Sequence, residues 1–326
     1  MCVIYLLSER TRAQKDHGRL VIETEGKKKM SVPLQEIEHV VIERRAQLTM
    51  PVLYALLEHK TQISYLDGQG NLIGTLGGEA CSLRRLLRQR EYFSQCELQL
   101  ALVREVVRIK IQRQKEILRG YAHSKKAMAL VIAGTELAGY AAKAERLEDL
   151  EELRGLEGMA SRRYFSSFAV ILEQNIWHWQ RRSHPAADPV NALLNYGYAF
   201  LEREVRRAIA GAGLDCRIGF FHSNNGRKDS LVYDLMERFR AKVTDRLVLK
   251  LLNYGAFSPD DFLAGQGGCR MVDGARNVWL EHYEKYMGKA VQEYDGQSPR
   301  EKIRAEVEDF AARVFRKRKE GSDGAA

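Results

Sequence analysis

The chain of 326 residues has few cysteines, and none of them forms a CxxC pair. The five are an odd number and lie far apart, at Cys2, Cys81, Cys96, Cys216 and Cys269. This pattern argues against a zinc ribbon, an iron–sulfur cluster or a disulfide framework. It fits reduced thiols, so we expect a cytoplasmic protein.

Long apolar runs are also missing. No stretch approaches the roughly 18 residues needed to span a bilayer, so we expect no membrane association. The short apolar segment 1–7 has no basic segment before it and no small-residue cleavage site, and it predicts a first strand, not a signal peptide. With only 6 prolines the chain can form long uninterrupted helices. The length is sufficient for two domains.

Positive charge is in excess, but unevenly. Residues 1–76 contain 10 Lys/Arg and 9 Asp/Glu, so the remaining 42 and 34 lie in 77–326. The excess of +9 therefore lies almost wholly in the later part, which would be the part that binds a polyanion such as nucleic acid. The alternative is that these charged residues only form the solvated surface of a helical domain.

Strand-like sequence is concentrated at the start of the chain. The β-rich runs cover residues 3–7, 19–24, 29–32, 37–42, 63–66 and 72–76. A helix is expected at 50–59, with Pro51 in its first turn. Gly77-Gly78 closes this small β-rich domain.

The remainder of the chain repeats apolar residues at three- and four-residue spacing. Helices are expected over 83–123, 124–137, 158–181, 190–210, 230–252, 277–287 and 298–316, with a short extended piece at 216–221. We predict an α+β protein: a small N-terminal β-rich domain over 1–78, a linker over 79–90, a large all-α domain over 91–318, and a disordered tail over 319–326.

Two short stretches of the helical part present single polar side chains beside glycine. Glu157 lies between Leu156 and Gly158, with Gly155 just before, where a helix is expected to begin. It is either a carboxylate near a ligand or one favoured by the helix macrodipole. His222 lies where an apolar run meets a polar loop and is either functional or a hydrogen-bonded structural histidine.

A third stretch places two acids on one helix. Asp234 and Glu237 are three residues apart and therefore share a face. Arg238 stands four residues after Asp234, so a plain salt bridge is the alternative for that acid.

Together these groups predict a metal site. Two carboxylates and an imidazole suit a hard or borderline ion, so Mg²⁺ or Mn²⁺ fits better than a structural zinc. Such an ion is the usual requirement for phosphodiester chemistry. The cations expected around it to hold phosphates are Arg162, Arg163, Arg227, Lys228, Arg238, Arg240, Lys242 and Arg246.

Five ordered blocks of sequence make the chain recognisable. They are Glu157-Gly158 with Arg163-Tyr164-Phe165, Asn191 with Leu194 to Tyr198, Gly219-Phe220 with His222, Ser230-Leu231 with Asp234 to Glu237 and Arg240, and Asp245-Arg246. Over about the last 170 residues their order and spacing resemble CRISPR-associated protein one, the endonuclease and integrase family of spacer acquisition. The β-rich start followed by a helical domain resembles the layout of that family.

The resemblance implies a catalytic helical domain and a homodimer formed through the β domain, with CRISPR-associated protein two as partner. It implies insertion of a prespacer DNA duplex at the repeat of a CRISPR array. Glu157, His222 and Glu237 then hold the metal. Asp234 is a nearby acidic helper in catalysis, which orients His222 or a metal-bound water, or holds a second ion. The alternative is a non-catalytic helical nucleic-acid-binding subunit.

Overall fold

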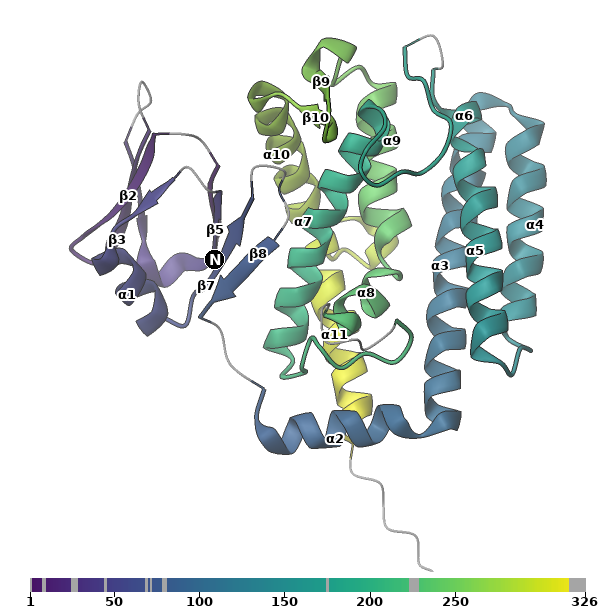
Figure 1. The fold of residues 1–326 in the computed structure, drawn as a ribbon, viewed down its shortest axis with the longest axis horizontal. Helices are drawn as coiled ribbons and strands as arrows, with labels where there is room; N and C mark the ends of the chain where they lie inside the picture. Colours follow the sequence, from purple (N-terminus) through teal and green to yellow (C-terminus); the bar gives the residue numbers. More distant parts are fainter. Residues whose placement is uncertain are drawn as a thin grey trace, which may run out of the picture. The chain divides into compact units, whose positions relative to one another are not determined.

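The computed structural model describes residues 2–7, 10–24, 29–43, 46–67, 70, 72–77, 81–173, 176–222 and 229–316 (Figure 1). A β-rich start precedes a largely helical remainder, as predicted. The chain divides into two compact units: unit 1 contains Met1–Glu79, Phe168–Leu201 and Thr244–Glu284, and unit 2 contains Ala80–Ser167, Glu202–Val243 and Lys285–Ala326. Two internal stretches of the helical part thus group with the N-terminal segment. Among the described residues, no helix is both long and apolar enough to cross a membrane.

Two four-stranded sheets form the N-terminal part of unit 1. The first has the order β1 (Cys2–Leu6), β5 (Ile37–Glu43), β7 (Gln62–Leu66) and β8 (Leu72–Leu76), parallel except for the antiparallel β7–β8 pair. The second has the order β4 (Met30–Pro33), β3 (Arg19–Thr24), β2 (Thr11–Asp16) and β6 (Gln47–Leu48). Helix α1 (Met50–Glu58) leads from β6 to β7 and, with the sheets, buries one apolar core that includes Leu20, Leu56 and Ile63.

The sequence did not reveal β2. Its Thr11 and Ala13 are buried, while Arg12 between them is exposed. A strand whose outward positions are charged shows little overall β-propensity, so only its pairing with β3 identifies it.

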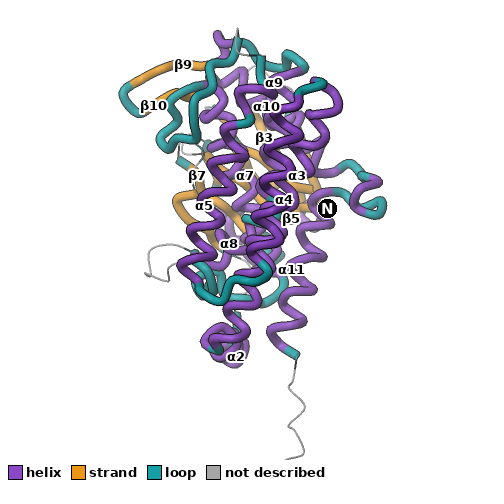
Figure 2. Tube along the Cα trace, turned by 90° about the vertical axis from the view of Figure 1, so that its right-hand side faces the viewer, coloured by secondary structure: helices purple, strands orange, loops and turns teal. Residues whose placement is uncertain are grey.

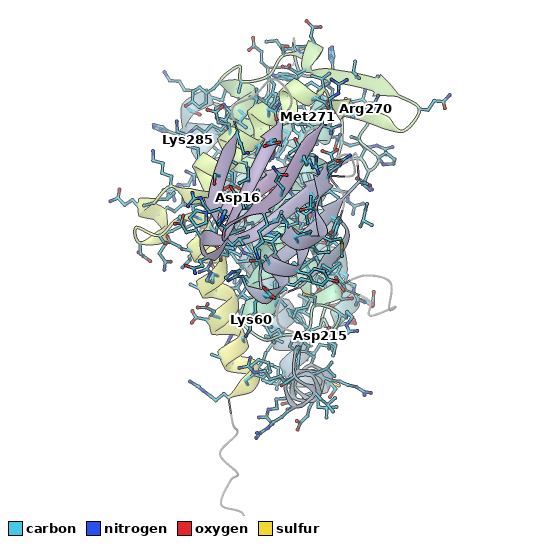
Figure 3. All side chains as sticks on the ribbon, turned by 90° about the vertical axis from the view of Figure 1, so that its left-hand side faces the viewer. Asp16, Lys60, Asp215, Arg270, Met271 and Lys285 are labelled. Carbon is cyan, nitrogen blue, oxygen red and sulfur yellow. The ribbon has the colours of Figure 1, made fainter. Side chains whose placement is uncertain are left out.

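The later stretches of unit 1 are mostly helical. They contain α6 (Phe168–Ile171), most of α7 (Pro189–Gly211), α9 (Arg246–Asn253), most of α10 (Asp273–Gly288), a 3₁₀ turn (Pro259–Asp261), and the hairpin of β9 (Phe262–Gly265) and β10 (Gly268–Met271). Figure 3 labels Arg270 and Met271 of this hairpin. Phe200, Trp279 and Tyr283 are buried together, with the Phe200 and Tyr283 ring centroids 4.9 Å apart.

Unit 2 is built around a long helix. Its elements are α2 (Leu83–Ser94), α3 (Cys96–Lys125), α4 (Met128–Ala144), α5 (Leu150–Ser166), α8 (Ser230–Met236), the start of a π-helical segment (Arg240–Asp245), a 3₁₀ turn (Gln292–Tyr294) and α11 (Pro299–Phe315). Helices α3, α4 and α5 pack side by side (Figures 1 and 2). At 30 residues α3 is about 45 Å long, so it offers one continuous wall to the other helices.

Several predicted helix boundaries are wrong. The helix expected at 83–123 is two helices, because Gln95 between them has extended backbone angles. Most of the segment 79–90, expected as a linker, belongs to α2, whose first turn is capped by the Ser82 side chain. The helix expected at 158–181 begins earlier and gives way to irregular chain after Ile171.

Two further expectations change near the candidate site. The segment 216–221 contains no strand and is a series of turns and irregular chain. The helix expected over 230–252 is interrupted by the π-helical segment Arg240–Asp245. A π-helical turn inserts an extra residue, so residues beyond it leave the face that a regular periodicity predicts. The disordered tail expected at 319–326 lies outside the described residues.

Candidate active site

Glu157 lies in the middle of helix α5, not at a helix start as predicted. The helix begins earlier because the Asp149 side chain caps it, accepting a hydrogen bond from the Glu151 amide at 3.0 Å. A Cβ on Gly155 or Gly158 would meet nothing within 4 Å, so neither glycine serves a close approach among the described residues. The position of Glu157 therefore depends on the face of α5 on which it lies, and not on the neighbouring glycines.

Glu157 shares a cation with Glu237. The ammonium of Lys110, on α3, forms ion pairs with Oε1 of Glu157 and with Oε2 of Glu237, the latter at 2.6 Å. Oε1 of Glu157 also accepts a hydrogen bond from the Ser161 hydroxyl, at 2.9 Å. Helices α3 and α5 and the residue that follows α8, all in unit 2, thus place side chains around one point.

Glu237 follows the last residue of α8, and its side chain is only 7% exposed. Its other oxygen, Oε1, lies 2.9 Å from Nε of Arg240. Burial of the Glu237 carboxyl would raise its pKa, but Arg240 and Lys110 outweigh burial and lower the pKa to about 2. Glu237 is therefore an ionised carboxylate inside the protein.

Asp234 fixes His222. The Asp234 side chain is fully buried, and it accepts hydrogen bonds from the backbone amides of Phe220 (2.6 Å), Phe221 (3.0 Å) and His222 (2.9 Å). Its Oδ1 also lies 2.6 Å from Nδ1 of His222. Because a carboxylate only accepts, Nδ1 carries the hydrogen, and the lone pair of the ring is on Nε2. The conformation of this segment requires Gly219, where a Cβ would lie 2.5 Å from Oδ2 of Asp234.

The alternative pairing of Asp234 with Arg238 is not observed. Arg238 instead lies 2.8 Å from Glu105 of α3 and 3.1 Å from Glu306 of α11, and Glu306 also pairs with Arg113 at 2.6 Å. These half-buried ion pairs connect the segment just after α8 to α3 and α11. Their effect is to hold the segment that carries Glu237.

The predicted phosphate contacts have different surroundings. Arg162 is exposed, whereas Arg163, the next residue of α5, forms an ion pair with Glu136 of α4. Arg246 is half-buried at the start of α9, in unit 1. Arg162 is thus the most accessible cation of these three.

Two other predicted phosphate contacts are already paired, and two lie outside the described residues. Arg240 pairs with Glu237, as described above, and Lys242 lies 2.7 Å from Glu116 and also pairs with Glu293. Arg227 and Lys228 fall in the gap 223–228, outside the described residues.

The carboxylate oxygens and the imidazole nitrogen are donor types that suit a divalent ion. Glu157 and Glu237 already share one cation, and the geometry of His222 leaves Nε2 as its donor atom, a combination suited to Mg²⁺ or Mn²⁺. In this arrangement, however, no three His, Cys, Asp or Glu side chains of the described chain are grouped closely enough to hold an ion. The Lys110 ammonium lies between the two carboxylates instead.

Sequence reasoning missed Lys110, although a signal was present. The residue falls on the buried stripe of α3 together with Val103, Val106, Val107 and Ile111. A lysine at a core position of an amphipathic helix needs a buried acidic partner, because an unpaired charge there is costly.

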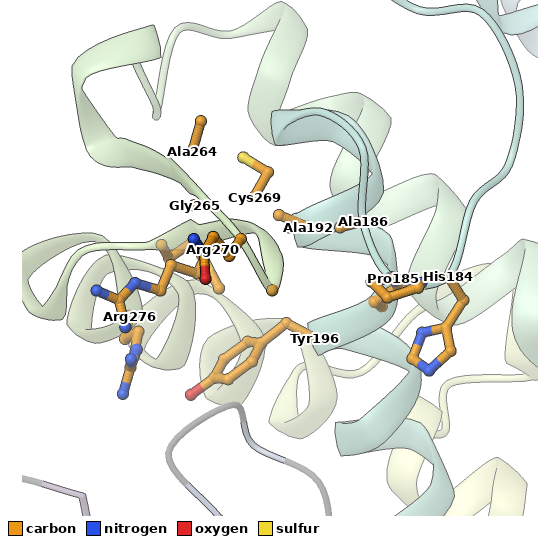
Figure 4. Close-up of a pocket in the computed structure, with 15 residues that line it drawn as sticks. His184, Pro185, Ala186, Ala192, Tyr196, Ala264, Gly265, Cys269, Arg270 and Arg276 are labelled. Carbon is orange, nitrogen blue, oxygen red and sulfur yellow. The ribbon is translucent and has the colours of Figure 1, made fainter.

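A separate cavity lies within unit 1. It has a volume of about 660 Å³ and lies between the β9–β10 hairpin and the first turns of α7, with Tyr196 and Arg276 among its lining residues (Figure 4). None of the predicted catalytic or metal-binding residues lines it. The residues on which the sequence-based prediction of phosphodiester chemistry rests therefore lie outside the lining of this cavity.

Comparisons with known proteins agree with the resemblance. A curated relative from Moorella thermoacetica, "CRISPR-associated endonuclease Cas1 1", is 34% identical over 294 residues, which are 86% of this chain and 85% of the relative. A solved structure, "Casposase bound to integration product", has a TM-score of 0.81 at 25% identity and covers 96% of this chain and 90% of that chain.

Two further solved structures share the fold. A Cas1 protein from Thermotoga maritima has a TM-score of 0.83 at 23% identity, over 99% of this chain and 100% of that one. A Cas6-RT-Cas1–Cas2 complex has a TM-score of 0.79 at 20% identity, over 96% of this chain and 35% of that chain. The family model described as CRISPR associated protein Cas1 matches residues 4–285. The chain therefore belongs to the Cas1 family.

Proposed function

We propose that this protein is a metal-dependent DNA endonuclease and integrase of CRISPR spacer acquisition. It inserts short prespacer duplexes into the CRISPR array. The observation that carries the proposal is the convergence of Glu157 and Glu237 on one cation, in the same unit as a histidine fixed by a buried aspartate. A buried carboxylate that is held ionised, as Glu237 is, would be costly for a protein that only binds nucleic acid through a basic face. The family and the casposase likeness support the same chemistry.

Glu157, His222 and Glu237 would hold Mg²⁺ or Mn²⁺. Bound there, the ion would polarise the phosphodiester and stabilise the leaving oxygen. Asp234 holds Nδ1 of the imidazole and so leaves Nε2 of His222 as the nitrogen that would bind the ion. Arg240 and Lys110 keep Glu237 ionised, as a carboxylate ligand must be.

The expected reaction is attack of a prespacer 3′-hydroxyl on the phosphodiester at the repeat end. A new phosphorus–oxygen bond forms to the prespacer, and the 3′-oxygen of the repeat strand leaves. Hydrolysis is the same displacement with water as the nucleophile. The exposed Arg162 would bind phosphate groups beside the reacting bond, since a guanidinium presents paired donors to phosphate oxygens.

The proposed partners are prespacer and repeat DNA, a second copy of the chain through the β-rich domain, and Cas2. A structural neighbour that contains Cas2 supports the last of these. We also propose that the β-rich segment 1–78 forms the dimerisation domain and that the helical segment 91–318 forms the catalytic domain.

The test compares cleavage of branched DNA and strand transfer with DNA binding. Activity should require Mn²⁺ or Mg²⁺ and stop with EDTA. Glu157→Gln should abolish both reactions and leave duplex binding intact. Glu152→Gln, an exposed acid in the first turn of the same helix, is the matched control and should keep full activity. Full activity in chelator, or in Glu157→Gln, would refute the proposal in favour of a non-catalytic DNA-binding subunit.

A further inference from the structure

Lys110 lies at the position between the two carboxylates that the proposed metal ion would take. The side chain is 11% exposed and carries its charge into the interior, between two acids 47 and 127 residues later in the sequence. It belongs to none of the motifs that identify the chain. An ordinary structural lysine at the rim of a helix would extend its ammonium to solvent, because the long aliphatic stem allows this at little cost.

Within the part of the chain that the structure describes, two acids and two cations form ion pairs around this point. Glu157 and Glu237 contribute two negative charges, and Lys110 and Arg240 contribute two positive ones. The cations use different oxygens of Glu237: Lys110 contacts Oε2, and Arg240 contacts Oε1. Lys110 also contacts Glu157, so its ammonium bridges the two carboxylates.

A divalent ion held by both carboxylates would compete for that position. Two cations in contact with the same carboxylate oxygen repel each other strongly in a buried environment, where solvent screens them poorly. The ammonium of a lysine can move out of this position, because it is a point charge on a flexible four-carbon stem.

We propose that Lys110 is a resident counter-ion that holds Glu157 and Glu237 together when no divalent ion is bound, and that a divalent ion displaces it. This inference rests on the proposed function, because it takes the two carboxylates as metal ligands. Lys110 is then a positioning residue that stabilises the fold and at the same time opposes metal binding. The apparent metal affinity is the intrinsic affinity multiplied by the fraction of molecules whose ammonium has withdrawn, so a small fraction weakens binding.

The two effects of Lys110 have opposite signs, which distinguishes this role from a merely structural one. In Lys110→Met the carboxylates lose their bridging cation, so the melting temperature measured in EDTA should fall. The same variant should bind Mn²⁺ at least about tenfold more tightly than the wild type. This holds if the ammonium has withdrawn in at most about a tenth of the wild-type molecules. Lys110→Arg keeps the charge and should show no such gain.

The measurements are calorimetric titration with Mn²⁺ and thermal unfolding with and without Mn²⁺. The control is Lys115→Met, a half-buried lysine of the same helix with no ion pair recorded within the described residues, which should change neither quantity. Unchanged or weaker Mn²⁺ binding in Lys110→Met, while Glu237→Gln abolishes binding, would overturn this inference and leave the proposed metal site standing. Mn²⁺ binding that survives both Glu157→Gln and Glu237→Gln would overturn the metal site itself, and this inference with it.

A measurement on the wild-type protein covers the case in which Lys110→Met fails to fold. Amine-selective labelling followed by mass spectrometry should find Lys110 protected in EDTA and several-fold more reactive at saturating Mn²⁺, as the ammonium loses its acidic partners. Lys115 should label equally in both conditions. Labelling of Lys110 that does not change across the Mn²⁺ titration would contradict the displacement.

Discussion

Replacing Asp234 by asparagine tests how a buried carboxylate controls the candidate ligand His222. The two oxygens of Asp234 accept four hydrogen bonds, three from backbone amides and one from the imidazole. The side chain of asparagine has one accepting oxygen and one NH₂ group of the same size. Whichever way it is turned, its NH₂ must face at least one N–H donor.

The less costly orientation can be identified. If NH₂ replaces Oδ2, it faces the amides of Phe220 and Phe221, which cannot change their protonation. If it replaces Oδ1, it faces the amide of His222 and Nδ1 of the ring, and the ring can respond by moving its hydrogen to Nε2. We expect the second orientation. It leaves one amide unpaired and removes the Nε2 lone pair that a metal ion would use.

The expected losses of stability and of Mn²⁺ affinity in Asp234→Asn follow from these contacts. One buried amide without an acceptor costs about 1–3 kcal/mol, and the remaining hydrogen bonds lose the strength that a charged acceptor gives them. We expect Asp234→Asn to lower the free energy of unfolding by about 2–5 kcal/mol, or the melting temperature by roughly 5–15 °C. Mn²⁺ affinity should fall about 10–100-fold.

Thermal unfolding in EDTA and a Mn²⁺ titration of strand transfer measure the two effects. Excess Mn²⁺ should partly restore Asp234→Asn, but should not restore Glu237→Gln, which lacks a direct ligand. A variant Asp234→Asn with wild-type stability and wild-type Mn²⁺ dependence would refute this reasoning. Rescue of Glu237→Gln with no rescue of Asp234→Asn would show that the two roles are reversed.

Three further predictions follow from charge and packing. Since the pKa of Glu237 is lowered in the folded protein to about 2 from 4.5, its stabilising contribution, on the order of 3 kcal/mol, is complete above pH 4.5 and is lost as the pH falls towards 2. Unfolding of Glu237→Gln should therefore depend less on pH in that window. Arg162→Ala should flatten the log-affinity versus log-salt slope on duplex DNA by about 0.9, and Arg163→Ala by less, because Arg163 is paired within the protein. Gly197→Ala should destabilise the fold by about 1–3 kcal/mol, since its Cβ would lie 2.7 Å from a threonine methyl, whereas Gly139→Ala, with open space and in a helix, should be neutral or stabilising in thermal unfolding.

The sequence predicted the order of the two parts of the chain better than it predicted helix boundaries. The sequence predicted Asp234 and Glu237 on one helix, because three-residue spacing on a helix fixes a shared face. In the structure α8 ends at Met236, and Glu237 is the residue that follows it. The interruption by a π-helical segment at Arg240–Asp245 could not be predicted, because it depends on tertiary packing. The start of α5 was misplaced because Gly158 resembled a boundary, whereas Asp149 provides the actual cap.

The partners of charged side chains were the least predictable feature. Arg238 was four residues from an acid on its own helix, yet it pairs with acids on two other helices, 133 and 68 residues distant. Lys110 pairs across similar separations. Sequence spacing constrains neighbours within an element, but pairs between elements depend on how the helices pack, which spacing does not encode.

Pairing also changes what the excess of positive charge means for DNA binding. The net charge counts every cation equally, but Arg163, Arg238, Arg240 and Lys242 each pair with a carboxylate of the same unit. A paired cation releases fewer counterions from DNA, because the protein has already neutralised it. The affinity for phosphate should therefore depend on exposed cations such as Arg162, while the paired ones hold the helices that carry the carboxylates. Neutralising a paired cation should therefore lower stability and metal binding more than it changes the salt dependence of DNA binding.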